Sequence, residues 1–530
     1  MTLGSDIPDQ NEANTPLSVA AAATTGGSLL QGFSWKMAST YVPQAYILAV
    51  SIAAARFLGP NDLGIQSFIA FTEFSVIMAV SAGFSRALMR NIGEALGADQ
   101  ADQLRYLVRW AWIVLGTAGL LGGASLVVVG AAGASPRFAW TFAGIAAALG
   151  IMHTVPSAVL IGAQRWRDAS IVGLATGAIG TVGVIAVLAA GGRITAMFCV
   201  EAAISTINLL WTTALASRAT SRYPLAPARD NRFKRQVLDY ASLATVASII
   251  DFIVWRRSEF YFLEHYSTND QIAFYSIAFA AATALIALPR AVGEIVAPAA
   301  ATLTGAGGSE RLASGYGRAV RLTLAASLPL TAAALALGPA VLEMIYGSDY
   351  RQARSVLVVL VLPLPVIVLF TIGSAFLIGL GLIRVQLLIT ACCALLNIGL
   401  DFFFIPRYGA LGAASANTLA QVAASVPTFV YASRCLKRVQ WSVRSLAHMA
   451  TASAAAGVAA FAVVTSLGAL LGVALGLSVG LMTFAILAGT LGVLAAEDAA
   501  WLDKAAGHRF GGLIGQATRL CSLRPASDAS

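Results

Sequence analysis

This chain has few charged residues for its length, and that scarcity excludes an ordinary soluble fold. Only 11% of its 530 residues are charged, whereas 58% are hydrophobic and the mean hydropathy is +0.78. Soluble domains carry about 25% charged residues, so the composition indicates that the bilayer is the solvent. Apolar stretches of about 20 residues recur along the chain, and each is long enough to cross a membrane as a helix. These stretches do not fit a membrane β-barrel, because its strands would be about 10 residues long and would alternate in polarity.

Motifs of catalysis and of nucleotide hydrolysis are also missing. The sequence has no H-E-x-x-H, P-loop or nucleophile-elbow pattern, and its four histidines are scattered. Its five cysteines lack metal-type spacing. We therefore expect neither an enzyme nor a bound cofactor, and any energy must come from a gradient of H⁺ or Na⁺, from the membrane potential or from removal of product.

Positive charge exceeds negative charge, but its placement argues against nucleic acid as a partner. The net charge is +9, and most Lys and Arg residues fall in alternate junctions between the apolar stretches and in the C-terminal tail. Because Lys and Arg concentrate in cytoplasmic loops, this asymmetry predicts that both termini are cytoplasmic. Membrane lipids, not nucleic acid, are the expected surroundings.

The apolar stretches predict an all-α integral membrane protein with about fourteen transmembrane helices, in two six-helix lobes plus a C-terminal helix pair. The longest connection is rich in Arg and Pro, which is typical of a linker between bundles. The predicted parts are a cytoplasmic tail at 1–32, an N-lobe at 33–216, a cytoplasmic linker at 217–235, a C-lobe at 236–436, extra helices at 437–496 and a cytoplasmic tail at 497–530.

The segment at one predicted outer turn is similar to a segment later in the chain. FLGPNDLGIQSFIAF (57–71) and FLEHYSTNDQIAFYSIAF (262–279) share an Asn-Asp pair, and aligning the two pairs superposes Ile-Ala-Phe in both segments. Each pair lies between the first two helices of a lobe, where Asn or Asp can cap the new helix. Recurrence at the same place favours a parallel repeat of two bundles that face a central cavity.

Three segments then resemble a known family. A-R-F-L-G-P-N-D-L-G (Ala55 to Gly64), G-F-S-R-A-L-M-R (Gly83 to Arg90) and the RYGALGAASAN turn (Arg407 to Asn417) are similar to the polysaccharide-transport, or oligosaccharide flippase, family. That family belongs to the multidrug/oligosaccharidyl-lipid/polysaccharide exporter superfamily. The resemblance implies a V-shaped bundle in the bacterial inner membrane that moves a polyprenyl-pyrophosphate-linked oligosaccharide outward by alternating access, for O-antigen, exopolysaccharide or capsule biosynthesis. It also implies a polysaccharide polymerase and a chain-length protein as partners.

Cations inside the predicted helices are the candidate ligands of the pyrophosphate and sugar. They are Lys36, Arg256, Arg257 and Arg290, on helices that line the cavity in the resembled family. Arg pairs well with phosphate oxygens. Snorkelling to an interface is the alternative for Lys36, Arg256 and Arg257, and an internal ion pair with Glu294 is the alternative for Arg290.

Acids inside the helices are the candidates for ion coupling or for a fixed counter-charge. Glu73 and Asp251 lie near the centres of their helices, while Glu259 and Glu294 follow Arg256 and Arg290 by three and four residues. The pairs Asn397 with Asp401 and Asn417 with Gln421 indicate contacts between helices.

Two other functions stay open. A cation-coupled multidrug exporter of the same superfamily shares the architecture, but such proteins typically carry an acid in their first helix, where this chain has Lys36. A membrane-embedded polysaccharide polymerase needs a sizeable outer loop, and the predicted outer loops are short.

Overall fold

The computed structural model is helical throughout the described part of the chain. The described residues are 26–97, 101–163, 165–220, 238, 241–242, 245, 259–305, 309–436, 439, 443–494 and 497–500. Their contacts divide the chain into two compact units, described separately below. Unit 1 comprises residues 1–50, 80–190 and 195–245, and unit 2 comprises residues 51–79, 191–194 and 246–530. The predicted lobe boundaries are not tested by this division and stay a prediction.

The first long element, α2 (Gly26–Gly97), contains the outer turn predicted from the sequence. Two helices merge across Gly59, whose φ of 77° and ψ of 173° lie outside the helical region. A positive φ suits glycine because a side chain would be strained there. The part of α2 around this turn, residues 51–79, belongs to unit 2.

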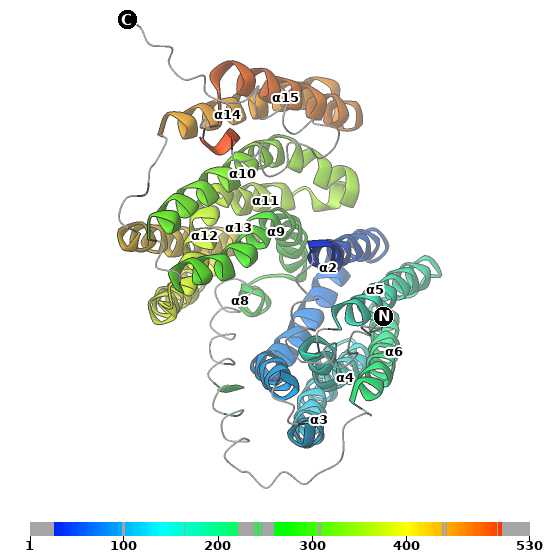
Figure 1. Ribbon diagram of the computed structural model, residues 1–530. Helices are drawn as coiled ribbons and strands as arrows, with labels where there is room; N and C mark the ends of the chain where they lie inside the picture. The colour runs from blue at the N-terminus through cyan, green and yellow to red at the C-terminus, as the bar shows by residue number, and fades with distance from the viewer. Residues whose placement is uncertain are drawn as a thin grey trace, which may run out of the picture. The chain divides into compact units, whose positions relative to one another are not determined.

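Figure 1 shows the remaining helices of unit 1, and polar contacts join some of them. They are α3 (Ala101–Ala131), α4 (Arg137–Gly162), α5 (Trp166–Ala189) and α6 (Ile194–Thr220). The hydroxyl of Tyr46 on α2 donates to the carbonyl of Leu174 on α5 across 3.2 Å. Between α4 and α6, His153 Nε2 lies 3.2 Å from Thr212 Oγ1.

Unit 2 contains the other helices, which pack around an extensive apolar core. They are α8 (Glu259–Tyr266), α9 (Asn269–Gly305), α10 (Ser309–Tyr346), η2 (Ser348–Tyr350), α11 (Ala353–Val361), α12 (Leu364–Gly379), α13 (Ile383–Cys435), α14 (Val443–Leu467) and α15 (Ala469–Leu491). α14 and α15 lie side by side against α10 (Figure 1). The core includes fully buried Tyr316 and Val320 of α10, Ile372 of α12 and Met449 of α14.

A buried ion pair attaches the segment after α15 to α10. Asp498 Oδ2 accepts from Arg321 Nε at 2.6 Å, and Asp498 Oδ1 accepts from Arg321 Nη2 at 2.8 Å. Arg318 Nε also reaches Asp498 Oδ1, at 3.3 Å. The contact between Arg321 and Asp498 is bidentate, which is the strong form of an Arg–carboxylate ion pair.

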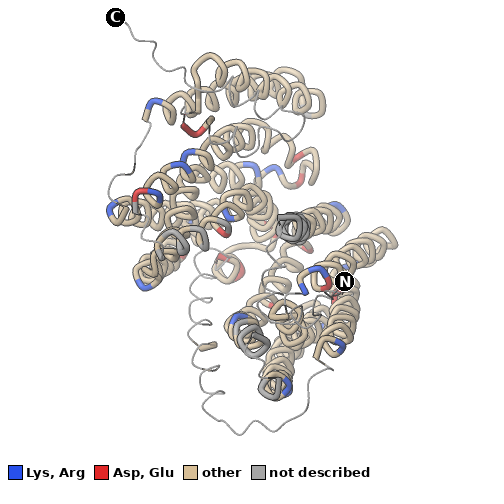
Figure 2. Tube along the Cα trace, viewed as in Figure 1, with Lys and Arg blue, Asp and Glu red and all other residues tan. Residues whose placement is uncertain are grey.

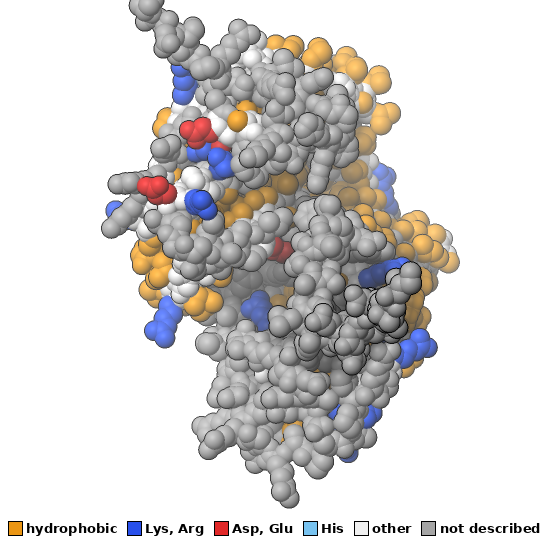
Figure 3. All heavy atoms as spheres, viewed as in Figure 1, with side chains coloured by type: hydrophobic (Ala, Val, Ile, Leu, Met, Phe, Trp, Pro, Cys, Tyr) orange, Lys and Arg blue, Asp and Glu red, His pale blue; other side chains and the backbone are white. Residues whose placement is uncertain are grey.

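Surface chemistry and helix length together agree with a multi-pass membrane protein. Among the described residues, ten helices are long and apolar enough to cross a membrane, or eleven with the bent pair α11 and α12. Charged residues are sparse along the helices (Figure 2), and hydrophobic side chains gather on the surface of α14 and α15 (Figure 3). Exposed examples are Val458, Phe461, Leu470 and Leu481. The predicted fold class, a bundle of membrane-spanning helices, is confirmed.

Candidate functional site

The most unusual feature of unit 2 is a group of polar side chains buried between apolar helices. Glu259 begins α8, Asn397 and Asp401 lie one turn apart on α13, and Asn417 and Gln421 lie one turn apart further along α13. Glu259, Asn397, Asp401 and Asn417 have no exposed surface, and Gln421 is 5% exposed. We call these five residues the Glu259 cluster.

A break in α13 lets its two halves contribute to one cluster. Gly409 has a φ of 54° and a ψ of −129°, so the helix is interrupted between Asp401 and Asn417. The backbone N–H of Ala410 then donates to Gln271 Oε1 of α9 at 3.0 Å, which holds the turn against its neighbour. Because the chain reverses there, side chains from both halves reach Glu259.

Two carboxamides donate to the same oxygen of Glu259. Asn417 Nδ2 lies 2.7 Å from Glu259 Oε1, and Asn397 Nδ2 lies 3.3 Å from it. Asn397 Nδ2 is also 3.4 Å from Asp401 Oδ2, and Gln421 donates to Asn417 Oδ1. The amides therefore orient one oxygen of the carboxylate.

Some oxygen atoms of the cluster have no hydrogen-bond partner. Glu259 Oε2 and Gln421 Oε1 are buried without one. Buried polar atoms are nearly always paired, and each exception requires an explanation. The described partners of Glu259 are the amides of Asn397 and Asn417 and the hydroxyl of Tyr275, and they include no cation, although a buried carboxylate without a counter-charge is costly. A proton or a cation bound at Oε2 would offset that cost.

The donor set fits a hard cation. Carboxylate and amide oxygens are the ligands that such ions prefer, and transporters place coupling ions near interrupted helices in the membrane. Glu259 and Gln421 would supply the available oxygens, with Asp401 as a second acid beside them. The same carboxylate can instead take up a proton.

An aromatic cluster joins this site to α2. The ring of Phe260, next to Glu259, stacks on Phe71 of α2 with centroids 4.9 Å apart. Tyr261 also meets Phe71, edge-on at 5.0 Å, and Tyr275 of α9 meets Phe260 at 5.6 Å. Because these rings are in direct contact, a movement of α8 would displace the second half of α2.

The turn at Gly59 in α2 contacts the segment that the sequence predicts to be its repeat. Asn269 Nδ2 donates to Asn61 Oδ1 at 3.0 Å, so the two equivalent asparagines of the predicted repeat meet each other. Asp62 pairs with Arg193 at 2.7 Å. The capping of a helix by Asn61 and Asp62 stays a prediction; within the turn, Asn61 Nδ2 also donates to Asp62 Oδ1 at 3.3 Å. Ser67 also donates to Ser276 of α9, at 3.1 Å.

The opposite side of this turn is fixed to the end of α10. Arg56 donates to the carbonyl oxygens of Met344 and Ile345, each at 2.6 Å. These carbonyls belong to the last turn of α10, where backbone oxygens lack partners within the helix. Tyr350 donates to the carbonyl of Ala55 at 3.0 Å. Within unit 2, residues 51–79 are thus held to α9 and α10 at several points.

The structure places only some of the predicted site residues. Glu259 and Glu73 are buried in unit 2, Arg290 is half-buried on α9, and Glu294 one turn later is exposed. No ion pair between Arg290 and Glu294 is found among the described contacts. Lys36 lies on α2, but its side chain is outside the description, and Asp251, Arg256 and Arg257 are outside the described residues.

The sequence analysis missed the association of Glu259 with the four polar residues of α13. It treated Glu259 as a partner of Arg256 and the two polar pairs of α13 as separate contacts between helices. The available signal was the spacing: each pair is four residues apart in an apolar helix, so each presents one polar face. Nothing in the sequence indicated that both faces converge on Glu259, which is 138 residues from Asn397.

Comparisons with known proteins agree with this architecture. Residues 259–403 match the MatE family model. A structure of the lipid II flippase MurJ in an inward closed conformation is 12% identical, has a TM-score of 0.70, and is matched over 87% of this chain and 98% of that chain. No curated protein matches the sequence.

Two further structures are similar over a smaller part of the chain. An inward-facing multidrug resistance transporter of the MATE family is 15% identical, with a TM-score of 0.59, covering 74% of this chain and 94% of its own. A MOP superfamily transporter from Pyrococcus furiosus is also 15% identical, with a TM-score of 0.57, covering 76% and 93%. The chain therefore contains a MatE region at residues 259–403 and has the fold of the MOP superfamily exporters.

Proposed function

We propose that this protein is a flippase that moves a polyprenyl-pyrophosphate-linked oligosaccharide across the bacterial inner membrane for surface polysaccharide biosynthesis. The observation that carries the proposal is the extent of the likeness to the lipid II flippase, which spans 87% of the chain against 74% and 76% for the two other transporters. A substrate with a lipid carrier also suits the apolar C-terminal helices. Both termini would be cytoplasmic, and a polymerase and a chain-length protein would act on the product.

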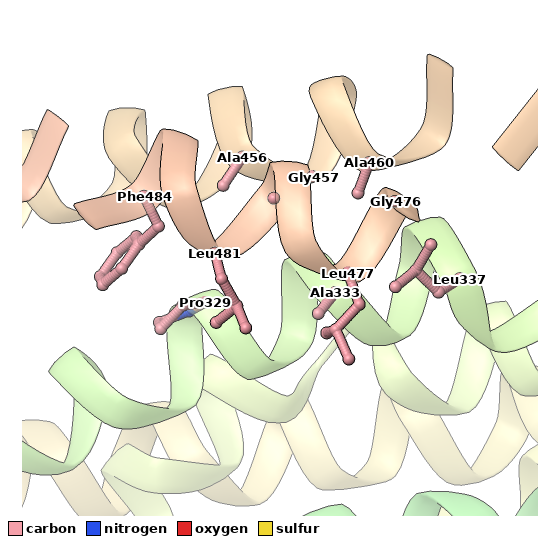
Figure 4. A pocket seen from close by; sticks show the side chains of 11 residues that line it. Pro329, Ala333, Leu337, Ala456, Gly457, Ala460, Gly476, Leu477, Leu481 and Phe484 are labelled. Carbon is pink, nitrogen blue, oxygen red and sulfur yellow. The ribbon is translucent and has the colours of Figure 1, made fainter. Parts of the chain in front are cut away.

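The C-terminal helix pair lines a small apolar pocket against α10. α14, α15 and α10 enclose an apolar cavity of about 50 Å³, into which Leu477, Leu481 and Phe484 of α15 project (Figure 4). Pro329 and Ala333 of α10 form part of its floor. Its apolar lining suits a small alkyl group, and its volume is that of a few water molecules and not of a polyprenyl chain.

In this proposal, the cations Lys36, Arg256, Arg257 and Arg290 bind the pyrophosphate and adjoining sugar, as the sequence predicted. Arg290 is the member whose place is described, half-buried on α9. Arg matches phosphate oxygens with paired hydrogen bonds, which favours it over a simple point charge.

The Glu259 cluster would couple transport to a gradient of Na⁺ or H⁺. Binding neutralises a carboxylate that is otherwise buried among the neutral groups of Asn397, Asn417 and Tyr275. A ligand can shift a conformational equilibrium only through its different affinity for the two states. Phe260 stacks on Phe71, so loading the site would favour the arrangement in which α2 packs on α8.

Cation-coupled drug export is the second candidate, and one observation favours it. The MatE match spans residues 259–403 and therefore includes Glu259, Asn397 and Asp401. A cation site in this region is compatible with either cargo, so the substrate must be tested directly.

Deletion of the gene in its host separates the two candidates. A flippase predicts loss of surface polysaccharide and accumulation of lipid-linked precursor on the cytoplasmic side, restored by the wild-type gene but not by Glu259→Gln at equal membrane abundance. Glu264→Gln is the matched control, because this acid lies on the same helix with its side chain exposed. A deletion that leaves precursor levels normal and raises drug sensitivity would favour the exporter instead.

A further inference from the structure

A second acid in a membrane helix is not used by the proposed mechanism. Glu201 lies on α6, seven residues after the helix begins at Ile194. At 1.5 Å per residue this is about 10 Å into a helix that is long and apolar enough to span the membrane. The side chain is exposed.

Glu201 does not face the same way as the exposed apolar side chains of α6. Leu210, 65% exposed, is nine residues later, which places it on the opposite side of the helix at 100° per residue. Met197 and Phe198, four and three residues earlier, share the side of Glu201 and are buried. Glu201 is therefore an exposed carboxylate on the side of α6 whose described neighbours are buried, opposite the side that carries the exposed apolar residues.

A polar stripe continues from Glu201 along the same side of α6. Ser205, Asn208 and Thr212 follow at spacings of four, three and four residues. Thr212 Oγ1 is 3.3 Å from Asn208 Oδ1 and 3.2 Å from His153 Nε2 of α4. The stripe from Glu201 to Thr212 is about 16 Å long, and its exposure falls from exposed Glu201 through half-buried Ser205 and Asn208 to buried Thr212.

The described titratable groups of α4 and α5 lie away from Glu201. α5 packs on α6 in the opposite direction, since Gly180 faces Ile204 and Gly183 faces Val200. Arg167 and Asp168 are in the first turn of α5, next to the far end of α6. On α4, Arg137 begins the helix, and His153 contacts the stripe at Thr212. Among the described contacts, Glu201 forms no ion pair.

An ionisable side chain in mid-membrane is expensive, and acids placed toward a water-filled opening mark pathways for protons and ions. We propose that Glu201 binds a proton from water that enters along the polar stripe of α6. The carboxylate accepts H⁺ and becomes a neutral carboxylic acid, so no co-reactant is needed. This site is in unit 1 and is separate from the Glu259 cluster of unit 2.

Infrared difference spectroscopy of the purified full-length protein tests the proposal independently of any transport. Spectra recorded in acidic and in alkaline buffer are subtracted, and the C=O stretch of protonated carboxyl groups is compared between variants. We expect Glu201→Gln to lose one carboxyl band that the wild type shows. Glu259→Gln is the matched control and must keep that band even if the proposed flippase function is wrong.

Two results would overturn the proposal. One is a Glu201→Gln spectrum identical to that of the wild type, because Glu201 would then not titrate. The other is a wild-type spectrum in which Na⁺ at constant pH, and not acid, alters the Glu201 band, because the site would then bind a metal cation. Glu201→Asp guards against a folding defect: it keeps a carboxyl group, so its band must persist at a shifted frequency.

Discussion

Replacing Gly64 with Ala should loosen the contact between the second half of α2 and the start of α9. A Cβ at position 64 would lie 1.9 Å from the carbonyl oxygen of Asn269, and 2.5 Å from its carbonyl carbon. A close C···O contact is roughly 3.3 Å, so the overlap is about 1.4 Å. The neighbour is backbone and cannot rotate away, so the two helices must separate.

The expected cost is the cost of overpacking, about 1 to 3 kcal/mol. A bias of that size shifts a conformational equilibrium by roughly 5- to 150-fold. The reporter is Ser67→Cys, because Ser67 is 9% exposed and bonds to Ser276 across the same contact. We expect a membrane-impermeant maleimide to label this cysteine at least about fivefold faster when Gly64→Ala is added, after subtraction of labelling at native cysteines.

Gly116→Ala supplies the matched control, since a Cβ at Gly116 meets nothing within 4 Å. It should leave labelling at position 67 unchanged and stabilise α3 by about 0.5 to 1 kcal/mol. Equal labelling rates in the Gly64→Ala and Gly116→Ala proteins would refute the close approach of α2 and α9.

The other contacts give three further expectations. Asp498→Asn removes the carboxylate that faces the buried Arg321 guanidinium, and it should lower the free energy of unfolding by about 3 to 5 kcal/mol. The double variant Arg321→Met, Asp498→Leu should recover much of that stability. Equal destabilisation of the single and the double variant would contradict a buried ion pair at this position. Asn417→Ala removes the shorter donor to Glu259 and should cost about 1.5 to 3 kcal/mol, whereas Asn91→Ala, whose side chain bonds only within its own helix turn, should cost far less. A double-mutant cycle between Phe71 and Phe260 should give a coupling energy of about 0.5 to 1.5 kcal/mol, and a coupling near zero would remove the proposed link between the site and α2.

Sequence alone predicted the features that depend on local pattern. The all-helical membrane fold follows from apolar runs, and the break at Gly59 follows from the adjacent Gly, Pro, Asn and Asp residues. The contact between Asn61 and Asn269 fits the repeat that the shared Asn-Asp pairs had indicated. The first two signals lie within one short segment, and the third comes from the likeness of two short segments 208 residues apart.

Features that depend on distant segments could not be predicted in this way. Glu259 and Asn417 are 158 residues apart, and their contact requires the turn at Gly409 to bring the second half of α13 back. Glu201 was missed for a related reason: the sequence shows one acid in an apolar helix, and only the burial of its neighbours reveals that it lies opposite the exposed apolar residues.

The most direct measurement is transport by the purified protein in proteoliposomes, with a fluorescent saccharide on a short-chain polyprenyl pyrophosphate as the probe. An imposed gradient of Na⁺ or H⁺ should accelerate movement of the probe between leaflets in the wild type and have no effect on Glu259→Gln, while Glu264→Gln should behave like the wild type. Movement that responds to the gradient equally in wild type and Glu259→Gln would contradict the assignment of the coupling site. No movement of the probe in the wild type would contradict the flippase itself.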